Sequence, residues 1–171
     1  SAPETAETEA YVAQLGVVRP AYRDHVWSYD FVRDRTSDGR AFRMLTLIDE
    51  YSRECLAIDV GRRLSSEDVL ERLTWLMATR GVPNYIRSDN GSEFINHNLF
   101  KYCKDTHLSM TRSRAGRKND NCYVEQKNFD TVRKLVGHAR FATQPAVDAL
   151  NELYRVQGQL QNFIYPSQTL I

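Results

Sequence analysis

The sequence predicts an α/β domain in which a mixed five-stranded sheet is flanked by helices. Three strand-like segments, residues 26–32, 42–48 and 55–60, follow one another with short turns between them, as in an antiparallel meander. Beyond residue 65 the apolar residues take up helical spacing, and helical and strand-like segments then alternate. A helix is the usual connection between parallel strands, so the later strands are expected to lie parallel to a strand of the meander.

Composition and turn residues define the first three strands. Residues 26–32 (VWSYDFV) are rich in aromatic and β-branched side chains, and residues 36–39 are turn formers. Residues 42–48 (FRMLTLI) are nearly all apolar, which is typical of a strand in the middle of a sheet. A second turn, residues 49–52, leads into the third strand at residues 55–60 (CLAIDV).

The helix that follows has recognisable ends. Apolar residues recur at helical spacing between positions 69 and 77. Ser65 with Asp68 three residues later resembles a capping box, and Gly81 marks the end of the helix. Three of its large side chains are expected to pack in the core: Leu73, Trp75 and Met77.

The second half of the chain supplies the remaining two strands and three further helices. A short strand at residues 85–88 is followed by a helix over about residues 96–106 and a fifth strand at 108–111. Two helices, about residues 121–140 and 144–162, complete the predicted order. Together these elements predict a mixed sheet with helices packed against it.

The composition is that of an ordinary globular domain. The chain has 171 residues, of which 42% are hydrophobic and 26% charged. Its net charge of +1 argues neither for nor against a polyanionic partner. Residues 1–19 begin with a small and acidic stretch and are expected to form a loose lead-in, so that residues 20–171 make up the folded domain.

Several patterns bear on the compartment. The three cysteines, Cys55, Cys103 and Cys122, lie far apart without CxxC spacing, which favours reduced thiols over a disulfide framework or a zinc site. No apolar run approaches the roughly 18 residues that a membrane span needs. The first residues also lack the pattern of a signal peptide. A cytoplasmic protein without membrane contact is therefore expected.

Three carboxylates stand where a single charge is costly. Asp30 lies inside an apolar strand, where burial without a partner is unfavourable. Asp89 directly follows the fourth strand, and ligands collect at the carboxyl ends of parallel strands. Glu125 is the one acidic member of a helical stripe that reads Cys122, Glu125, Phe129, Val132, Val136. Taken singly, a solvent-facing Asp30 and an Asp89 that caps the following Asn-Gly turn are equally ordinary explanations.

Taken together, the three acids indicate a site for divalent cations. Mg²⁺ prefers hard oxygen ligands, usually a few carboxylates completed by water and substrate phosphates. Two such ions about 3.5–4 Å apart serve in-line displacement at phosphorus, because one activates the attacking oxygen and the other stabilises the leaving oxygen. The Asn-Gly turn after Asp89 would end the strand sharply and leave this carboxylate at its tip.

Four segments carry a resemblance to a known family. They are VWSYDFV around Asp30, LTLIDEYSRECLAI at residues 45–58, IRSDNGSEF around Asp89 and KNDNCYVEQKNFDTVRKLVG around Glu125. In this order they resemble the catalytic core of retroviral integrases and of related bacterial insertion-sequence transposases. That family carries an Asp, Asp, Glu triad with 35 residues between the last two, and 35 residues separate Asp89 from Glu125. The resemblance extends from about residue 20 to the end.

The resemblance implies a fold, an activity and partners. The fold would be ribonuclease-H-like, with the first three strands antiparallel and the fourth and fifth parallel to the first. Proteins of this family cut DNA at element ends and join the 3′ hydroxyl to target DNA, with two Mg²⁺ or Mn²⁺ ions. The catalytic and metal-binding triad carries over to Asp30, Asp89 and Glu125. A homodimer or higher multimer in the bacterial cytoplasm, associated with the nucleoid when acting, is expected. A separate domain or partner would recognise the ends.

Basic residues near the third acid are candidates for DNA contact. Residues 112–118 hold four cations, and two lysines lie on the following helix. Phosphate binding by these side chains would be sensitive to salt and little dependent on base sequence. A solvated basic loop and an ordinary helix surface are the alternatives. The candidates are Arg112, Arg114, Arg117, Lys118, Lys127 and Lys134. Asn90 and Glu93 are candidates to support the metal ligands or to touch a DNA end.

Two other functions remain open. A metal-dependent nuclease of the same fold would cut DNA without joining it, and its catalytic residues would look the same. A catalytically silent domain for DNA binding or dimerisation would keep the fold but has no need of an intact triad. Four further acids are expected to lie outside the site: Asp34, Asp49, Glu50 and Asp59. Of these, Asp49 is expected to organise the turn that follows it.

Overall fold

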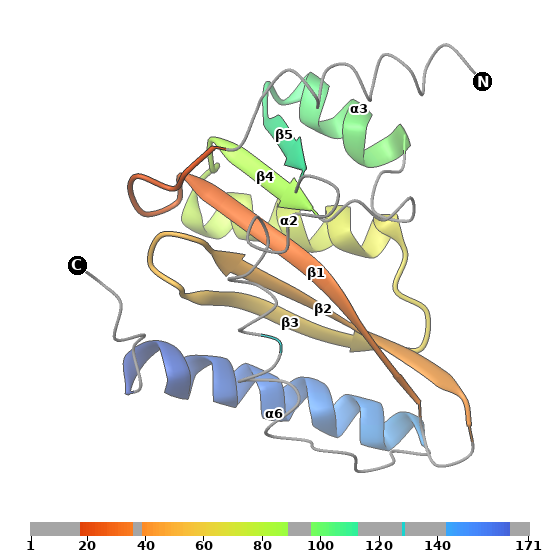
Figure 1. Cartoon of the computed structure of the whole chain (residues 1–171). Helices are drawn as coiled ribbons and strands as arrows, with labels where there is room; N and C mark the ends of the chain where they lie inside the picture. Colours follow the sequence, from red (N-terminus) through yellow and green to blue (C-terminus); the bar gives the residue numbers. More distant parts are fainter. Residues whose placement is uncertain (1–17, 36–38, 89–96, 113–127, 129–142, 165–171) are drawn as a thin grey trace.

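The computed structural model describes residues 18–35, 39–88, 97–112, 128 and 143–164, and the structure below is that of these residues. Five strands form one sheet in the order β3-β2-β1-β4-β5 (Figure 1). Their bounds are β1 Val26–Arg35, β2 Ala41–Asp49, β3 Cys55–Gly61, β4 Tyr85–Ser88 and β5 Ser109–Arg112. In this order β1, the longest of the five strands, lies in the centre of the sheet.

The strand directions are those predicted from the element order. β1 pairs antiparallel with β2, and β2 antiparallel with β3. β4 lies parallel to β1, and β5 parallel to β4. The helices between these strands act as the crossovers that parallel pairing requires. The predicted fold class, a mixed five-stranded sheet flanked by helices, is thus confirmed.

In the described ranges three helices accompany the sheet: α2 Ser66–Arg80, α3 His97–Asp105 and α6 Gln144–Phe163. The start of α2 is the predicted capping box, in which the carboxylate of Asp68 accepts the backbone N–H of Ser65 at 2.6 Å. Its end at Gly81 has φ 110°, a left-handed conformation that glycine adopts without a Cβ penalty. The backbone N–H of Gly81 donates to the carbonyl of Met77 at 3.1 Å.

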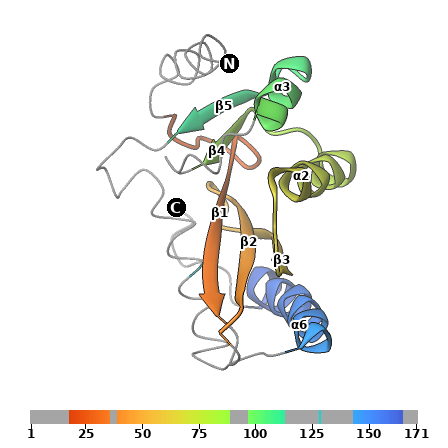
Figure 2. The same cartoon turned by 90° about the vertical axis from the view of Figure 1, so that its right-hand side faces the viewer.

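Side chains alternate between the two faces of the sheet and form two cores. Trp27 and Tyr29 of β1 pack in one core with residues of α2 and α3. Val32 of the same strand packs in the other core with residues of α6. Consequently α2 and α3 cover one face and α6 contacts the other, alongside β3 (Figures 1 and 2).

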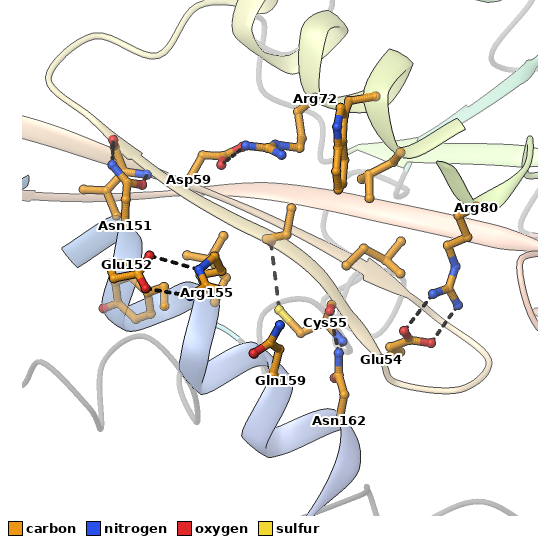
Figure 3. Close-up of a pocket in the computed structure, with 18 of the residues that line it drawn as sticks. Glu54, Cys55, Asp59, Arg72, Arg80, Asn151, Glu152, Arg155, Gln159 and Asn162 are labelled. Atoms are coloured by element: carbon orange, nitrogen blue, oxygen red, sulfur yellow. Dashed lines mark hydrogen bonds and ion pairs between the residues drawn. The ribbon is translucent and has the colours of Figure 1, made fainter. Parts of the chain in front are cut away.

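Helix α6 also binds the backbone of β3, which is an edge strand. The side-chain amide of Asn151 accepts the N–H of Val60 at 2.6 Å and donates to its carbonyl at 2.9 Å. Asn162 makes the same pair of bonds with Cys55, at 2.9 and 2.8 Å. Figure 3 shows Asn162 beside Cys55 and Asn151 further along the helix. Two amides of α6 thereby satisfy backbone groups that an edge strand otherwise leaves unpaired.

A few predictions differ from the structure. β1 extends to Arg35, three residues beyond the predicted end, and β5 begins one residue later than predicted. The prediction that Trp75 packs in the core is wrong, since 54% of it is exposed, whereas Leu73 and Met77 are buried as predicted. Helical geometry explains the difference: position 75 is about 200° around the helix from position 73.

Other predictions lie partly outside the described residues. These are the turn at 36–38, Cys122, and the helix of residues 121–140 with the exception of Asn128. Cys55 and Cys103 are buried free thiols, as expected. None of the helices in the described ranges is long and apolar enough to cross a bilayer.

Candidate active site

Asp30 lies in the middle of β1 and points to the face that α6 contacts. Alternation along the strand puts it on the same side as Val32 and opposite Tyr29. Its side chain is partly exposed, and its partner in the neighbouring strand β2 is Thr46. One carboxylate oxygen accepts the backbone N–H of Phe31 at 2.8 Å. This carboxylate is the predicted triad member that the structure describes.

The other carboxylate oxygen of Asp30 accepts a hydrogen bond from Asn128. The distance from Asn128 Nδ2 to Asp30 Oδ2 is 2.8 Å, and 6% of Asn128 is exposed. The two residues are 98 positions apart in the sequence. Asn128 is three residues beyond Glu125, which is one turn of the predicted helix. Its proximity to Asp30 was not predicted, although the spacing from Glu125 could have indicated it.

Two residues that neighbour Asp30, its strand partner Thr46 and its hydrogen-bond donor Asn128, each carry a further polar oxygen. Thr46 Oγ1 and Asn128 Oδ1 are buried and have no hydrogen-bond partner among the residues that the structure describes. A carboxylate, an amide oxygen and a hydroxyl are groups that suit a hard divalent cation or its water ligands. The chemistry of these groups therefore fits Mg²⁺ or Mn²⁺ better than a metal that prefers sulfur or imidazole.

The carboxyl end of β4 lies next to β1, at the position where the second acid was predicted. Ser88 ends β4 and is fully buried. Asp89, Asn90 and Glu93 lie outside the described residues, as does Glu125. Within the described ranges, no group of three or more His, Cys, Asp or Glu residues could hold a metal ion. Asp30 is the one predicted ligand that those ranges include.

A buried ion pair, Arg87 with Glu50, lies on the same face of the sheet as Asp30, beside the position two residues before it in β1. Arg87 of β4 is paired in register with Ser28, two residues before Asp30. Its Nη1 lies 2.7 and 3.0 Å from the carboxylate oxygens of Glu50. The Arg87 and Glu50 side chains are 4% and 1% exposed. Burial raises the pKa of Glu50 to about 7, and the charge of Arg87 opposes this rise.

The predicted DNA-binding residues fall almost wholly outside the described chain. Arg112 is the last residue of β5 and is paired in register with Ser88, so its backbone lies beside the end of β4. Its side chain is not described, and the remaining candidates lie outside the described ranges: Arg114, Arg117, Lys118, Lys127 and Lys134. Their DNA contacts stay predictions.

The acids expected to lie outside the site have partners of their own. Asp49 organises its turn as predicted, since its Oδ2 accepts the backbone N–H and the hydroxyl of Ser52 at 3.0 and 2.5 Å. Asp59 forms two hydrogen bonds of 2.6 Å with Arg72, on the face of α2. Asp34 accepts the backbone N–H of Arg35 at 2.7 Å.

A groove of about 740 Å³ lies elsewhere, between β3, α6 and the end of α2 (Figure 3). Asp30 is not among the residues that line it. Pairs of opposite charge occupy much of its wall: Asp59 with Arg72, Glu54 with Arg80, and Glu152 with Arg155. We do not assign the reactive site to this groove, because the charged side chains along its wall already neutralise one another.

Comparison with known proteins places the chain in a family. It matches the integrase core domain over residues 21–118. It is 32% identical to an insertion element IS407 uncharacterized 31.7 kDa protein of Burkholderia multivorans, over 87% of this chain and 56% of that protein. The chain therefore spans somewhat more than half the length of this relative.

Solved structures share the fold. The magnesium complex of the HTLV-2 integrase catalytic core domain, in a dimeric form, has a TM-score of 0.64 and 15% identity. This match covers 85% of the present chain and 91% of the other. A simian T-cell lymphotropic virus intasome has a TM-score of 0.62 and 17% identity, covering 86% of this chain and 51% of that one. Together with the strand order, these likenesses identify a ribonuclease-H-like fold, as predicted.

Proposed function

This chain belongs to the integrase core domain family, and we propose that it is the catalytic domain of a bacterial insertion-sequence transposase. It would hydrolyse a phosphodiester bond at each end of a DNA element and join the freed 3′ hydroxyl to target DNA. In this proposal residues 20–171 form the catalytic core, and the reaction takes place in the bacterial cytoplasm, on the nucleoid. The relatedness to an insertion-element protein supports the class of element.

The hydrogen bond between Asn128 and Asp30 is the observation that carries the proposal. It brings Asn128, which follows Glu125 by three positions in the sequence, into contact with the acid of the central strand. The described contact joins Asp30 to Asn128 alone, and it supports the proposal because Asn128 stands only three positions after Glu125 in the sequence. A chance spacing of acids gives no reason for such a contact.

The register of β4 supports the same role for Asp89. Val26 is paired with Tyr85, and the same sequence separation relates Asp30 to Asp89. Continuation of this parallel register past Ser88 would make Asp89 the neighbour of Asp30. We infer from this that the two aspartates flank one site, beside the middle of β1 and the carboxyl end of β4, and the carboxyl ends of parallel strands are where α/β sheets bind ligands.

Asp30, Asp89 and Glu125 would hold two Mg²⁺ or Mn²⁺ ions. When bound, these ions supply activation of the attacking oxygen and stabilisation of the leaving oxygen at phosphorus. The protein residues orient the carboxylates: Asn128 and the N–H of Phe31 each donate to a different oxygen of Asp30. Fixed carboxylates need no reorganisation during the reaction, which is the general source of electrostatic catalysis.

DNA would lie across the same face. Phosphate contacts are proposed for the basic residues that follow β5 and for two lysines beyond Glu125: Arg112, Arg114, Arg117, Lys118, Lys127 and Lys134. Asn90 and Glu93 would support the ligands or touch the DNA end. A dimer or higher multimer is proposed to bring two ends together, because a similar core has been solved in a dimeric form. Recognition of end sequence is assigned to a further domain or partner.

The test compares triad variants in a joining assay. Asp30→Asn, Asp89→Asn and Glu125→Gln remove one charge each at nearly constant volume. With labelled duplex DNA carrying the element ends and with Mn²⁺, each variant is expected to lose joining by at least about 100-fold, as for loss of major electrostatic groups. Asp34→Asn, on the same strand, is the matched control and should retain activity. Circular dichroism should show all four folded.

The products distinguish the alternatives. Joined product from the wild-type protein supports a transposase, whereas nicked DNA without joining would assign a nuclease. DNA binding without metal dependence and without cleavage would assign a catalytically silent module. Full joining activity in any triad variant would refute the proposed mechanism.

A further inference from the structure

The ion pair of Arg87 and Glu50 connects four parts of the chain behind the candidate site. The guanidinium of Arg87, in β4, binds Glu50, which directly follows β2. Its Nε donates to Thr111 Oγ1 in β5 at 3.3 Å, and its Nη2 donates to the carbonyl of Val18. A planar group with donors in fixed directions therefore bonds to three segments other than its own.

Stability alone is a poor explanation for this pair. Arg87 is 3% exposed and Glu50 is fully buried, so both charges have lost most of their hydration. Replacing a buried ion pair with apolar residues of similar volume is often neutral or stabilising. The packing around β4 could therefore be achieved without charge, and a different property of the pair has to account for it.

The place of the ion pair in the sheet suggests what that other property is. In the described chain β4 and β5 have four residues each, and they are paired in parallel from Tyr85 with Ser109 to Ser88 with Arg112. Arg87 is two residues before Asp89 in the sequence, and Arg87 and Ser28 form a register pair one layer from Asp30. Because side chains two residues apart in a strand share a face, Arg87 stands in the row that leads to the proposed metal ligands.

We propose that Arg87 is a positioning residue for the two aspartates, with Glu50 as its anchor. The guanidinium fixes β4 against β5, the turn after β2 and residue 18, and so sets the position of Ser88, the residue that precedes Asp89 in the sequence. Glu50 balances the charge of Arg87, which would otherwise oppose a divalent cation in the next layer. The inference rests on the proposed function, since it presupposes that Asp30 and Asp89 bind the ion.

The test replaces both charges together and measures metal affinity. Arg87→Met with Glu50→Met keeps the buried volume and leaves no unpaired charge. Mn²⁺ binding is followed by the electron paramagnetic resonance signal of the free ion. We expect the dissociation constant for Mn²⁺ to rise at least tenfold while the melting temperature stays within a few degrees. Amide hydrogen exchange at residues 85–88 should become faster in the same variant.

The ion pair of Asp59 and Arg72 provides the matched control. It has the same chemistry, but it lies on the face of α2, at the opposite edge of the sheet (Figure 3). Asp59→Leu with Arg72→Met should leave Mn²⁺ affinity unchanged. Equal weakening in both double variants would overturn the proposal, since it would mean that any change in stability affects the metal site.

Further outcomes separate this inference from the proposed function. Unchanged Mn²⁺ affinity in the Arg87 and Glu50 double variant, with wild-type binding lost on Asp30→Asn, overturns the positioning role alone. Absence of wild-type Mn²⁺ binding, or binding unaffected by Asp30→Asn, overturns the proposed metal site and this inference with it. If the double variant fails to fold, Arg87→Lys decides: it keeps the charge but not the planar fork, and a dissociation constant equal to wild type overturns the proposal.

Discussion

Removing the amide of Asn151 should destabilise the domain through the backbone of β3. Asn151 bonds both the N–H and the carbonyl of Val60, at 2.6 and 2.9 Å, and Val60 is 6% exposed. Asn151→Ala leaves these two polar groups without their partner. Each buried unsatisfied group costs about 1–3 kcal/mol. Partial access of water at a sheet edge favours the lower half of the sum, about 2–4 kcal/mol.

Urea unfolding followed by circular dichroism measures this loss directly. For a chain of this length a loss of about 2–4 kcal/mol corresponds to a fall in melting temperature of roughly 5–15 °C. Asn162→Ala, which removes the same contacts at Cys55, should give a similar loss. Gln159→Ala, an exposed position on the same helix, is the control and should stay within about 0.5 kcal/mol of wild type. A loss below about 0.5 kcal/mol for Asn151→Ala would refute the reasoning, since water would then replace the amide at no cost.

Three further predictions concern single side chains. Burial raises the pKa of Glu50 from 4.5 to about 7, so the associated stability is fully present below pH 4.5 and is lost as pH rises through 7. Glu50→Gln should remove this pH dependence of the unfolding free energy, which is worth up to about 3 kcal/mol. If the melting temperatures of wild type and variant changed in parallel with pH, this prediction would be contradicted. Burial raises the pKa of Cys103 to about 12, so mass spectrometry should find this thiol unalkylated at pH 8 until the protein unfolds. Native labelling at the rate of a free thiol would be inconsistent with that burial. Arg80 binds Glu54 at 2.7 and 2.6 Å and Asp24 at 2.7 Å. Arg80→Met should therefore lower the unfolding free energy by about 1–3 kcal/mol, and an unchanged urea midpoint would argue against this network.

Local patterns were sufficient to predict most of the fold. Apolar strands, the capping box at Ser65 and the glycine at position 81 each depend on neighbouring residues, and the structure confirms them. Crossover helices then dictate the parallel placement of β4 and β5. These features follow from period and turn chemistry, which a single sequence displays.

Contacts between distant segments were beyond such patterns. The pairing of Glu50 with Arg87 across 37 positions was not predicted; it arises because β2 and β4 lie on either side of β1. The contact of Asn128 with Asp30 likewise depends on how a helix meets a strand 98 positions away. Such pairs arise from tertiary register. No local pattern indicates the contact of Glu50 with Arg87, whereas the three-residue spacing of Asn128 from Glu125 is an indirect signal for its contact with Asp30.

The amide bonds from α6 to β3 also bear on how the protein behaves in concentrated solution. An unpaired strand edge is a template on which a strand of another molecule can add, which is a common first step in aggregation. An incoming strand along β3 would have to displace Asn151 at Val60 and Asn162 at Cys55 before it could extend the sheet. The helix that completes one core therefore also keeps the sheet closed to intermolecular growth at this edge.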